Sequence, residues 1–136
     1  MAHALHAYDG VCSNIHGHSY NLEITLLGRV PNNPGHPKDG MVMDFHDLKQ
    51  LVKKYVVDEF DHSLMVNRHI QEESAEALRK TTSRIRIVDF QPTTENIITH
   101  IAEILMPLLP DGVKLFSIRL YETVTSFAEW YASDNP

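Results

Sequence analysis

The chain has 136 residues, of which 43% are hydrophobic, and its formal net charge is −6 with the histidines neutral. This length predicts a single domain with a core of moderate size. The acidic balance argues against a nucleic-acid partner, because nucleic-acid binding depends on lysine and arginine neutralising phosphates. An anionic small-molecule substrate stays open, since local charge or a bound metal can outweigh the global balance.

Cysteine usage and hydropathy predict a compartment. The single cysteine, Cys12, cannot form an internal disulfide, which is typical of a reducing, cytoplasmic setting. No apolar run approaches the length of a membrane span, and no signal-peptide pattern opens the chain. We therefore expect a cytoplasmic protein without a membrane partner. The unusual residue type is histidine, which occurs nine times.

The first strong pattern combines histidines with a strand. Residues 18–28 alternate between apolar and polar side chains, which is typical of a half-buried β-strand. His16 and His18 are spaced so that their side chains share one face of an extended chain and can converge on one point. Gly17 between them lets the backbone or a ligand approach closely.

The chain then enters a loop and a helix. Residues 31–37 are dense in proline, asparagine and glycine and predict a loop. Residues 41–43 are expected to form a short strand that returns antiparallel to the first. Asp44 is suited to cap a helix whose apolar residues recur at helical spacing and which ends before Asp61.

The second half predicts three strands and a further helix. Residues 67–84 are polar and irregular, and we interpret them as a surface insertion in which 72–80 could form a short helix. The remaining elements are a strand over 85–90, a helix that opens with Thr93 or Thr94 as N-cap and ends at Pro107, and a final pair of strands over 113–121 and 126–132.

This order of elements predicts an α+β fold in which antiparallel strands form a sheet and both helices cover one face. No repeat or linker indicates a second domain, so 1–136 is expected to be one unit. A sheet this small leaves its edges exposed, and oligomerisation would bury them.

The histidines have a structural and a functional interpretation. A bare His-x-His occurs often by chance, and His16 and His18 could be surface or structural residues. Nearby His3, His6 and Cys12 favour a metal site instead. Neutral imidazole ligands favour zinc over a hard, oxygen-seeking cation.

Four further side chains allow two interpretations each. Cys12 is either a small buried residue or a thiolate stabilised by a nearby cation. Asp61 and His62 either cap a helix or act as an acid–base pair in which the carboxylate orients the imidazole. Glu122, which continues the apolar face of a strand, either ends that strand near water or binds a planar ligand with two donors.

Taken together, these residues resemble the 6-pyruvoyl-tetrahydropterin synthase superfamily over nearly the whole chain. The three-residue gap between Cys12 and His16 is similar to that of the bacterial branch that makes 6-carboxy-tetrahydropterin for queuosine biosynthesis. The resemblance rests on six motifs in order: Ala2-His3-Ala4-Leu5, Cys12-x-x-x-His16-Gly17-His18-x-Tyr20, Gly40-Met41-Val42-Met43-Asp44-Phe45, Asp61-His62, Pro92-Thr93-x-Glu95-Asn96 and Glu122-Thr123.

The resemblance implies a tunnelling fold whose protomers associate into trimeric barrels and stacked hexamers, with sites between subunits. It implies a zinc-dependent lyase that converts 7,8-dihydroneopterin triphosphate to 6-carboxy-tetrahydropterin, acetaldehyde and triphosphate. The roles that it implies are zinc ligation by His3, His16 and His18, proton transfer by Cys12, Asp61 and His62, and pterin binding by Glu122 with Thr93 and Thr94.

Two departures from the family pattern accompany this resemblance. The family has a strand before its Ala-His motif, whereas Met1 is only two residues ahead of His3, so the first strand is expected to be truncated. No glycine-rich loop is present to hold a triphosphate. Two alternatives stay open: a 6-pyruvoyl-tetrahydropterin synthase, which keeps the carbon chain, and a non-enzymatic binding module stabilised by metal.

Overall fold

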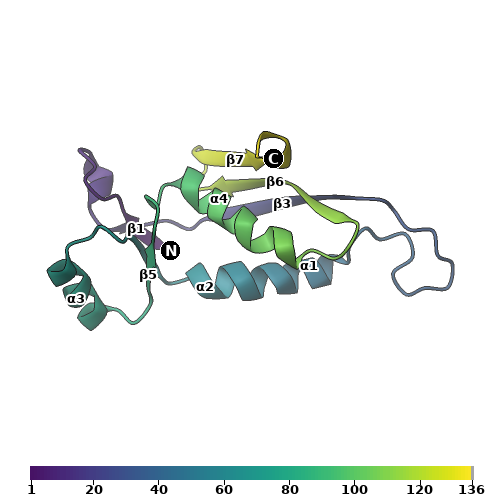
Figure 1. Ribbon diagram of the computed structural model, residues 1–136, viewed down its shortest axis with the longest axis horizontal. Coiled ribbons are helices and arrows are strands. Elements are labelled where there is room, and N and C mark those ends of the chain that lie inside the picture. Colours follow the sequence, from purple (N-terminus) through teal and green to yellow (C-terminus); the bar gives the residue numbers. More distant parts are fainter. Residues whose placement is uncertain (136) are drawn as a thin grey trace.

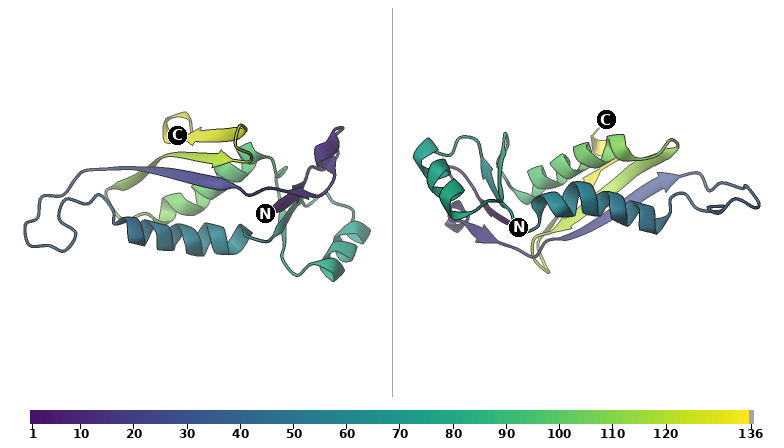
Figure 2. Two further views of the ribbon diagram at one scale, coloured as in Figure 1. Left: turned by 180° about the vertical axis from the view of Figure 1, so that it is seen from behind. Right: turned by 90° about the horizontal axis from the view of Figure 1, so that it is seen from below.

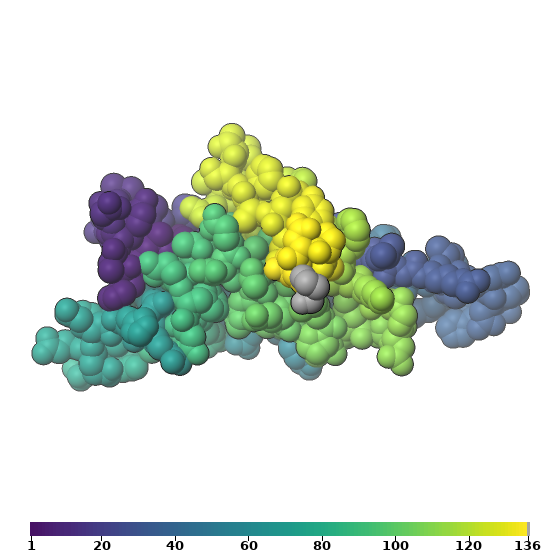
Figure 3. Space-filling view, turned by 45° about the horizontal axis from the view of Figure 1, so that its top comes forward, coloured from purple at the N-terminus to yellow at the C-terminus, as the bar shows by residue number. Residues whose placement is uncertain are grey.

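The computed structural model describes residues 1–135, which form two small sheets and two long helical segments. The molecule is elongated (Figures 1 and 3). The loop between 29 and 44 projects at one end, and the N-terminal segment lies with a short helix at the other. Within the described residues, no helix is long and apolar enough to cross a bilayer.

One sheet has three long strands and is antiparallel, in the order β3–β6–β7. Side chains of β3 alternate between exposed and half-buried, as its period-two pattern predicts. Within the described residues, β3 and β7 each pair on one side only, so the sheet has two free edges. The strands are β3 (Asn21–Gly28), β6 (Val113–Tyr121) and β7 (Phe127–Tyr131).

Two helical segments cover one face of this sheet (Figure 2). The first joins α1 (Phe45–Val52), the π-helical η2 (Lys53–Val57) and α2 (Asp58–Phe60) without a break. The second is α4 (Thr94–Leu105), followed by the 3₁₀ turn η3 (Met106–Leu108). The predicted caps are confirmed: the Asp44 side chain accepts from the His46 amide, and the Thr93 side chain accepts from the Asn96 amide.

The core lies between these helices and the sheet. Its members are apolar residues of α4 and inward-facing residues of β6 and β7, with Val56 from the first helical segment and Met65 from a second sheet. They are fixed by the 3.6-residue period of the helix and the two-residue period of the strands. The main contributors are Ile97, Ile98, Ile101, Leu105, Leu115, Ile118, Leu120 and Trp130.

The second sheet has the order β2–β1–β4–β5 and is mostly parallel. β1 pairs antiparallel with β2, and β4 lies between β1 and β5. The helix α3 (Glu72–Thr81) connects β4 to β5. The strands are β1 (Ala2–Ala4), β2 (His16–Gly17), β4 (Leu64–Asn67) and β5 (Ile85–Val88), and two 3₁₀ turns, η1 (Val11–Ser13) and η4 (Ala132–Asp134), complete the elements.

The α+β class is confirmed, and two details of the predicted topology are wrong. Residues 41–43 form no strand, because β3 pairs with β6 instead of returning on itself. The region 67–84 is mostly exposed and contains the suggested helix, α3, but this helix is the crossover between the parallel strands β4 and β5 rather than an insertion. The buried strand β4, which this crossover serves, was not predicted.

Candidate metal centre and a neighbouring acid–base pair

Three imidazoles and one carboxylate converge at the end of β3. His3, His16, His18 and Glu122 each offer one ligand atom, and these atoms all lie within 4.8 Å of one another. The ring centroid of His3 is 4.5 Å from that of His16 and 5.3 Å from that of His18. Three nitrogen donors and one oxygen donor at this spacing are typical of a divalent transition-metal site.

Backbone carbonyls fix the tautomers of two of these histidines. His3 Nδ1 lies 2.6 Å from the carbonyl of Pro92, and His16 Nδ1 lies 2.8 Å from the carbonyl of Asn14. A carbonyl can only accept, so each Nδ1 carries a proton, and it is Nε2 that presents a lone pair when the ring is neutral. This outer-shell arrangement is the one that orients ligating histidines in metal proteins.

The residues present therefore fit a metal ion, and an independent observation supports the fit. The Nε2 atoms of His16 and His18 are buried, and within residues 1–135 they have no hydrogen-bond partner. Glu122 Oε1 is 3.1 Å from His18 Nε2, which is ion-pairing distance, but it lies outside the hydrogen-bonding directions of that nitrogen. Buried nitrogens normally have partners, so these two are explained by a shared ligand.

Burial prepares His3 for the same role. Its side chain is 2% exposed, and this burial lowers the pKa of the imidazole more than the hydrogen bond to Pro92 raises it. A lowered pKa keeps the ring neutral at physiological pH, which is the form that binds a metal.

Glu122 is held by the start of α4 and lies beside Tyr20, which the sequence motifs include but to which no role was assigned. Thr94 Oγ1 donates to Glu122 Oε2, while Tyr20 Oη lies 3.5 Å from His3 Nε2. Burial, and then the charge of Glu122, raise the pKa of the Tyr20 phenol, so it stays protonated at neutral pH. The Thr93 side chain is the helix N-cap and accepts from the Asn96 amide.

Strand register brings Glu122 to the histidines. β3 and β6 pair with Asn21 opposite Tyr121, so one further step places Glu122 beside Tyr20. Tyr20 and His18 are two residues apart on one extended segment and share a face. On the other side, His3 of β1 pairs directly with His16 of β2. The spacing of His18 and Tyr20 was the signal that would have identified the tyrosine.

Cys12 lies outside this group of ligand atoms. It sits in η1 and is half-buried, and its carbonyl accepts from the Leu5 amide at 2.9 Å. That bond places it beyond the paired His3 and His16 on the same β-ribbon. Its thiol role stays a prediction.

Asp61 and His62 form an ion pair at the end of the first helical segment. His62 Nδ1 is 2.9 Å from Asp61 Oδ2, and this hydrogen bond lowers the pKa of the Asp61 carboxyl. Both side chains are open to solvent, at 58% and 87% exposed respectively. His62 also has a φ of +55°, the left-handed conformation in which glycine usually ends a helix.

The energetics of this pair do not favour a purely structural role. An ion pair this exposed to solvent contributes little to stability. A left-handed conformation costs a residue with a side chain about 1–2 kcal/mol. Because the cost equals or exceeds the gain, the fold holds His62 in this geometry at a net expense in stability, as is common at functional sites.

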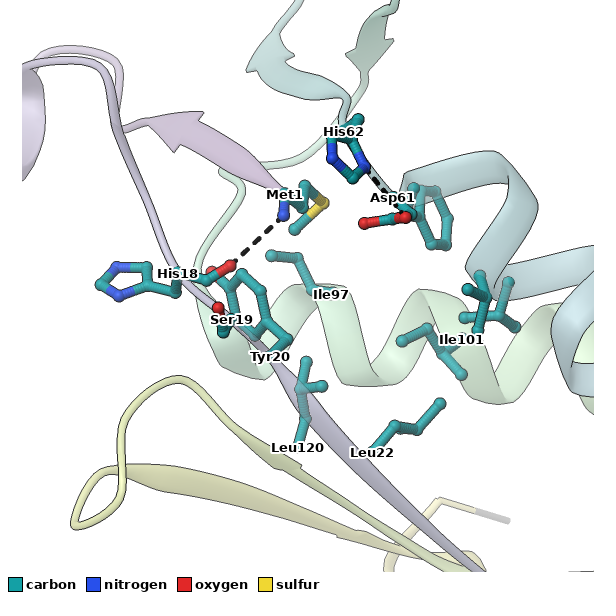
Figure 4. A pocket seen from close by; sticks show the side chains of 13 residues that line it. Met1, His18, Ser19, Tyr20, Leu22, Asp61, His62, Ile97, Ile101 and Leu120 are labelled. Carbon is teal, nitrogen blue, oxygen red and sulfur yellow. Dashed lines mark hydrogen bonds and ion pairs between the residues drawn. The ribbon is translucent and has the colours of Figure 1, made fainter.

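A cavity of about 420 Å³ opens beside this pair. Apolar side chains of β3, α4 and β6 line its interior, and Asp61 and His62 lie at its rim (Figure 4). The His18 ring points away from the cavity, although the His18 carbonyl faces it and accepts from the Met1 ammonium at 3.3 Å. Within one protomer, the His18 ring thus points away from the cavity that Asp61 and His62 border.

The sequence therefore identified most of the side chains in both groups but not their outer contacts. His3, His16, His18, Glu122 and Thr94 are brought together, whereas Cys12 and the Asp61–His62 pair lie apart from them. The carbonyls of Pro92 and Asn14 carry no side-chain signal and could not have been predicted.

Comparison with known proteins places the chain in a family. The family model described as 6-pyruvoyl tetrahydropterin synthase matches residues 1–133. A protein of Haemophilus influenzae named 6-carboxy-5,6,7,8-tetrahydropterin synthase is 39% identical over 132 residues, which cover 96% of this chain and 91% of that protein. A 6-pyruvoyl tetrahydrobiopterin synthase of Pongo abelii is 31% identical and is covered to 66% of its length, against 84% of this chain.

A solved structure agrees at the level of the fold. The crystal structure of an uncharacterized protein from Wolinella succinogenes superposes with a TM-score of 0.75 at 22% identity, covering 96% of this chain and 91% of that one. With the matched family model and the curated relatives, this likeness shows that the chain belongs to the 6-pyruvoyl tetrahydropterin synthase family, with its α+β tunnelling fold.

Proposed function

We propose that the protein is a zinc-dependent 6-carboxy-5,6,7,8-tetrahydropterin synthase. It would convert 7,8-dihydroneopterin triphosphate and one water molecule to 6-carboxy-tetrahydropterin, acetaldehyde and triphosphate. The observation that carries the proposal is the convergence of three imidazoles and Glu122, with two buried Nε2 atoms that lack a hydrogen-bond partner within residues 1–135. The names of the relatives, among them a protein of Aquifex aeolicus at 33% identity, support the choice of reaction.

His3, His16 and His18 would hold the metal through their Nε2 atoms. A bound zinc ion acts as a Lewis acid that acidifies the hydroxyl groups of a ligand in its open coordination position. Glu122, with one oxygen held by Thr94, would accept hydrogen bonds from the paired donors of the pterin ring. This binding orients the carbon side chain of the substrate toward the histidines.

The proton transfers would fall to Cys12, Asp61 and His62. The Asp61 carboxylate holds the Nδ1–H of His62, which leaves Nε2 of that ring free to take or give a proton at a side-chain carbon of the substrate. The exposure of this pair lets it reach a substrate bound on a neighbouring surface.

We further propose that the complete site forms between two copies of the chain. The His18 ring points away from the cavity that Asp61 and His62 border (Figure 4), and within the described residues the three-stranded sheet has free edges at β3 and β7. Leu27 of β3, Phe127 of β7 and Phe116 of the central strand β6 are roughly half exposed, at 57%, 49% and 46%. Pairing of edges would cover this apolar surface in a trimeric or hexameric assembly.

A product assay tests the reaction directly. With 7,8-dihydroneopterin triphosphate as substrate and zinc-loaded protein, we expect acetaldehyde and 6-carboxy-tetrahydropterin in equal amounts. A 6-pyruvoyl product without acetaldehyde would assign the chain to the other branch of the family. Neither product, from protein that binds zinc tightly, would support a metal-stabilised binding module.

Mixing two inactive variants tests the role of Cys12. Cys12→Ala is expected to keep its metal and lose turnover, and His16→Ala to lose both. If Cys12 serves the cluster of a neighbouring copy, refolding the two variants together in equal amounts should restore activity at roughly a quarter of the sites, by random assembly. Cys12→Ala protein with the turnover of wild type would exclude the thiol from catalysis, and inactive mixtures would place both groups in one protomer.

A further inference from the structure

The helix end that precedes Asp61 has four terminal carbonyls, and backbone amides satisfy only two of them. The Val57 carbonyl accepts from the Asp61 amide at 2.8 Å, and the Phe60 carbonyl accepts from the Ser63 amide at 3.1 Å. The carbonyls of Asp58 and Glu59 have no such partner, as is usual in the last turn of a helix.

Two arginines supply the missing donors. Arg84 Nη2 donates to the Asp58 carbonyl at 2.5 Å, and Arg86 Nε donates to the Glu59 carbonyl at 3.1 Å. Arg86 also forms an ion pair with the Glu59 side chain at 2.7 Å. Two guanidinium groups at a helix C-terminus complement the partial negative charge of that end.

The spacing of these arginines follows from the strand that carries them. Arg84 immediately precedes β5 and Arg86 lies within it, so their side chains share one face of the extended segment. β5 pairs with β4, and the Leu64 amide donates to the Arg84 carbonyl at 2.8 Å. The segment that carries Arg84 and Arg86 therefore holds the chain on both sides of the Asp61–His62 pair. It contacts Glu59 just before the pair and Leu64 just after it.

We infer that Arg84 and Arg86 are positioning residues for the Asp61–His62 pair, an inference that rests on the proposed function. Neither arginine touches the cavity beside the pair. They hold the last helical turn against β5, and this contact keeps His62 in its left-handed conformation at the cavity rim. The crossover through α3 places β5 beside β4, where Arg84 and Arg86 can reach the helix end.

Arg84→Met tests this inference, with Arg79→Met as the matched control. Arg79 pairs only with Glu72 on the exposed side of α3, at 3.0 Å. We expect Arg84→Met to lower kcat by about 10–100-fold, since small misplacement of a catalytic group has effects of this size. KM should stay within about twofold and bound zinc should be unchanged, because binding groups and metal ligands lie elsewhere. Arg79→Met should behave as wild type.

Two further measurements keep the inference open to refutation. Arg84→Lys, which keeps one donor and the charge, should recover part of the lost kcat, and Arg86→Met gives a second test if Arg84→Met does not fold. Amide hydrogen exchange over 58–63 should be faster in Arg84→Met and unchanged in Arg79→Met. A normal kcat, or a loss expressed only in KM, would overturn the positioning role.

The same data separate this inference from the proposed function. If the wild-type protein has no lyase activity, the proposed function fails. Hydrogen exchange over 58–63 then decides alone whether the arginines hold this turn, and unchanged exchange in Arg84→Met would refute the inference.

Discussion

The His16→Ala protein is expected to bind zinc at least about 100-fold more weakly than wild type. Outer-shell partners of a metal ligand already change affinity by about 10–100-fold, and removal of a ligand should exceed this. Turnover should fall by about 1,000-fold or more, because a Lewis acid contributes several kcal/mol and each 1.36 kcal/mol is tenfold in rate. Zinc content after dialysis against a chelator of known affinity, together with kcat, measures both effects.

His16 is a better choice than His3 for this experiment. His3 is 2% exposed and lies in β1 between two strands, so its replacement would disturb the fold as well as the site. His16 lies in the two-residue strand β2 and is only half-buried. Circular dichroism and the melting temperature without metal should therefore match those of wild type.

Glu122→Ala is the matched control, because Glu122 is the fourth member of the same cluster. If it anchors the pterin rather than the metal, its removal should raise KM strongly and leave zinc content alone. A fall in zinc content similar to that of His16→Ala would instead make Glu122 a ligand and close the coordination shell. The cluster would then be a structural metal site, as in the binding-module alternative.

Local patterns in the sequence predicted the parts of the fold that local chemistry decides. The alternation along β3, the Asp44 cap and the apolar stripe of α4 each specify an element without help from distant residues. The convergence of His16 and His18 followed from the same strand geometry.

Pairings between distant strands were beyond these patterns. Residues 41–43 resemble a strand only by their short apolar run, and the partner that they would have needed is occupied by β6. β4 is four buried residues with no alternation, a pattern typical of a parallel strand with both faces covered, and it was missed. Because β4 and β5 were not seen as neighbours, neither was the contact of Arg84 with the helix end.

Prediction of the site met the same limit, because local patterns do not reveal contacts between distant segments. Side chains with metal-binding chemistry could be identified one by one, and Thr94 could be assigned to the neighbourhood of Glu122 from the motifs. The carbonyls of Pro92 and Asn14 fix the imidazole tautomers only through backbone geometry, which no residue type reveals. Tertiary structure was therefore needed to show that the histidines are already oriented for a ligand.

Replacement of His62 by glycine should lower activity without lowering stability. His62→Gly and His62→Ala both remove the imidazole, so each should lower kcat by about 10²–10⁴-fold, the usual contribution of a general acid or base. Zinc content should be unchanged, because His62 is not among the clustered ligand atoms.

The two variants should differ in stability, because only one of them relieves the backbone. Alanine at a φ of +55° keeps the unfavourable conformation, whereas glycine adopts it freely. We expect His62→Gly to be about 1 kcal/mol more stable than His62→Ala and to melt about 4 °C higher. The loss of the exposed ion pair is common to both variants and cancels in the comparison.

Urea denaturation of the metal-free proteins measures this difference without the contribution of bound zinc. An inactive His62→Gly protein that is no less stable than wild type would mean that the helix end is shaped for catalysis and not for folding. Equal stability of the glycine and alanine variants would remove the backbone argument, because the left-handed conformation would then carry no cost. Retained turnover in both variants would leave Asp61 and His62 as a helix terminus without a catalytic role.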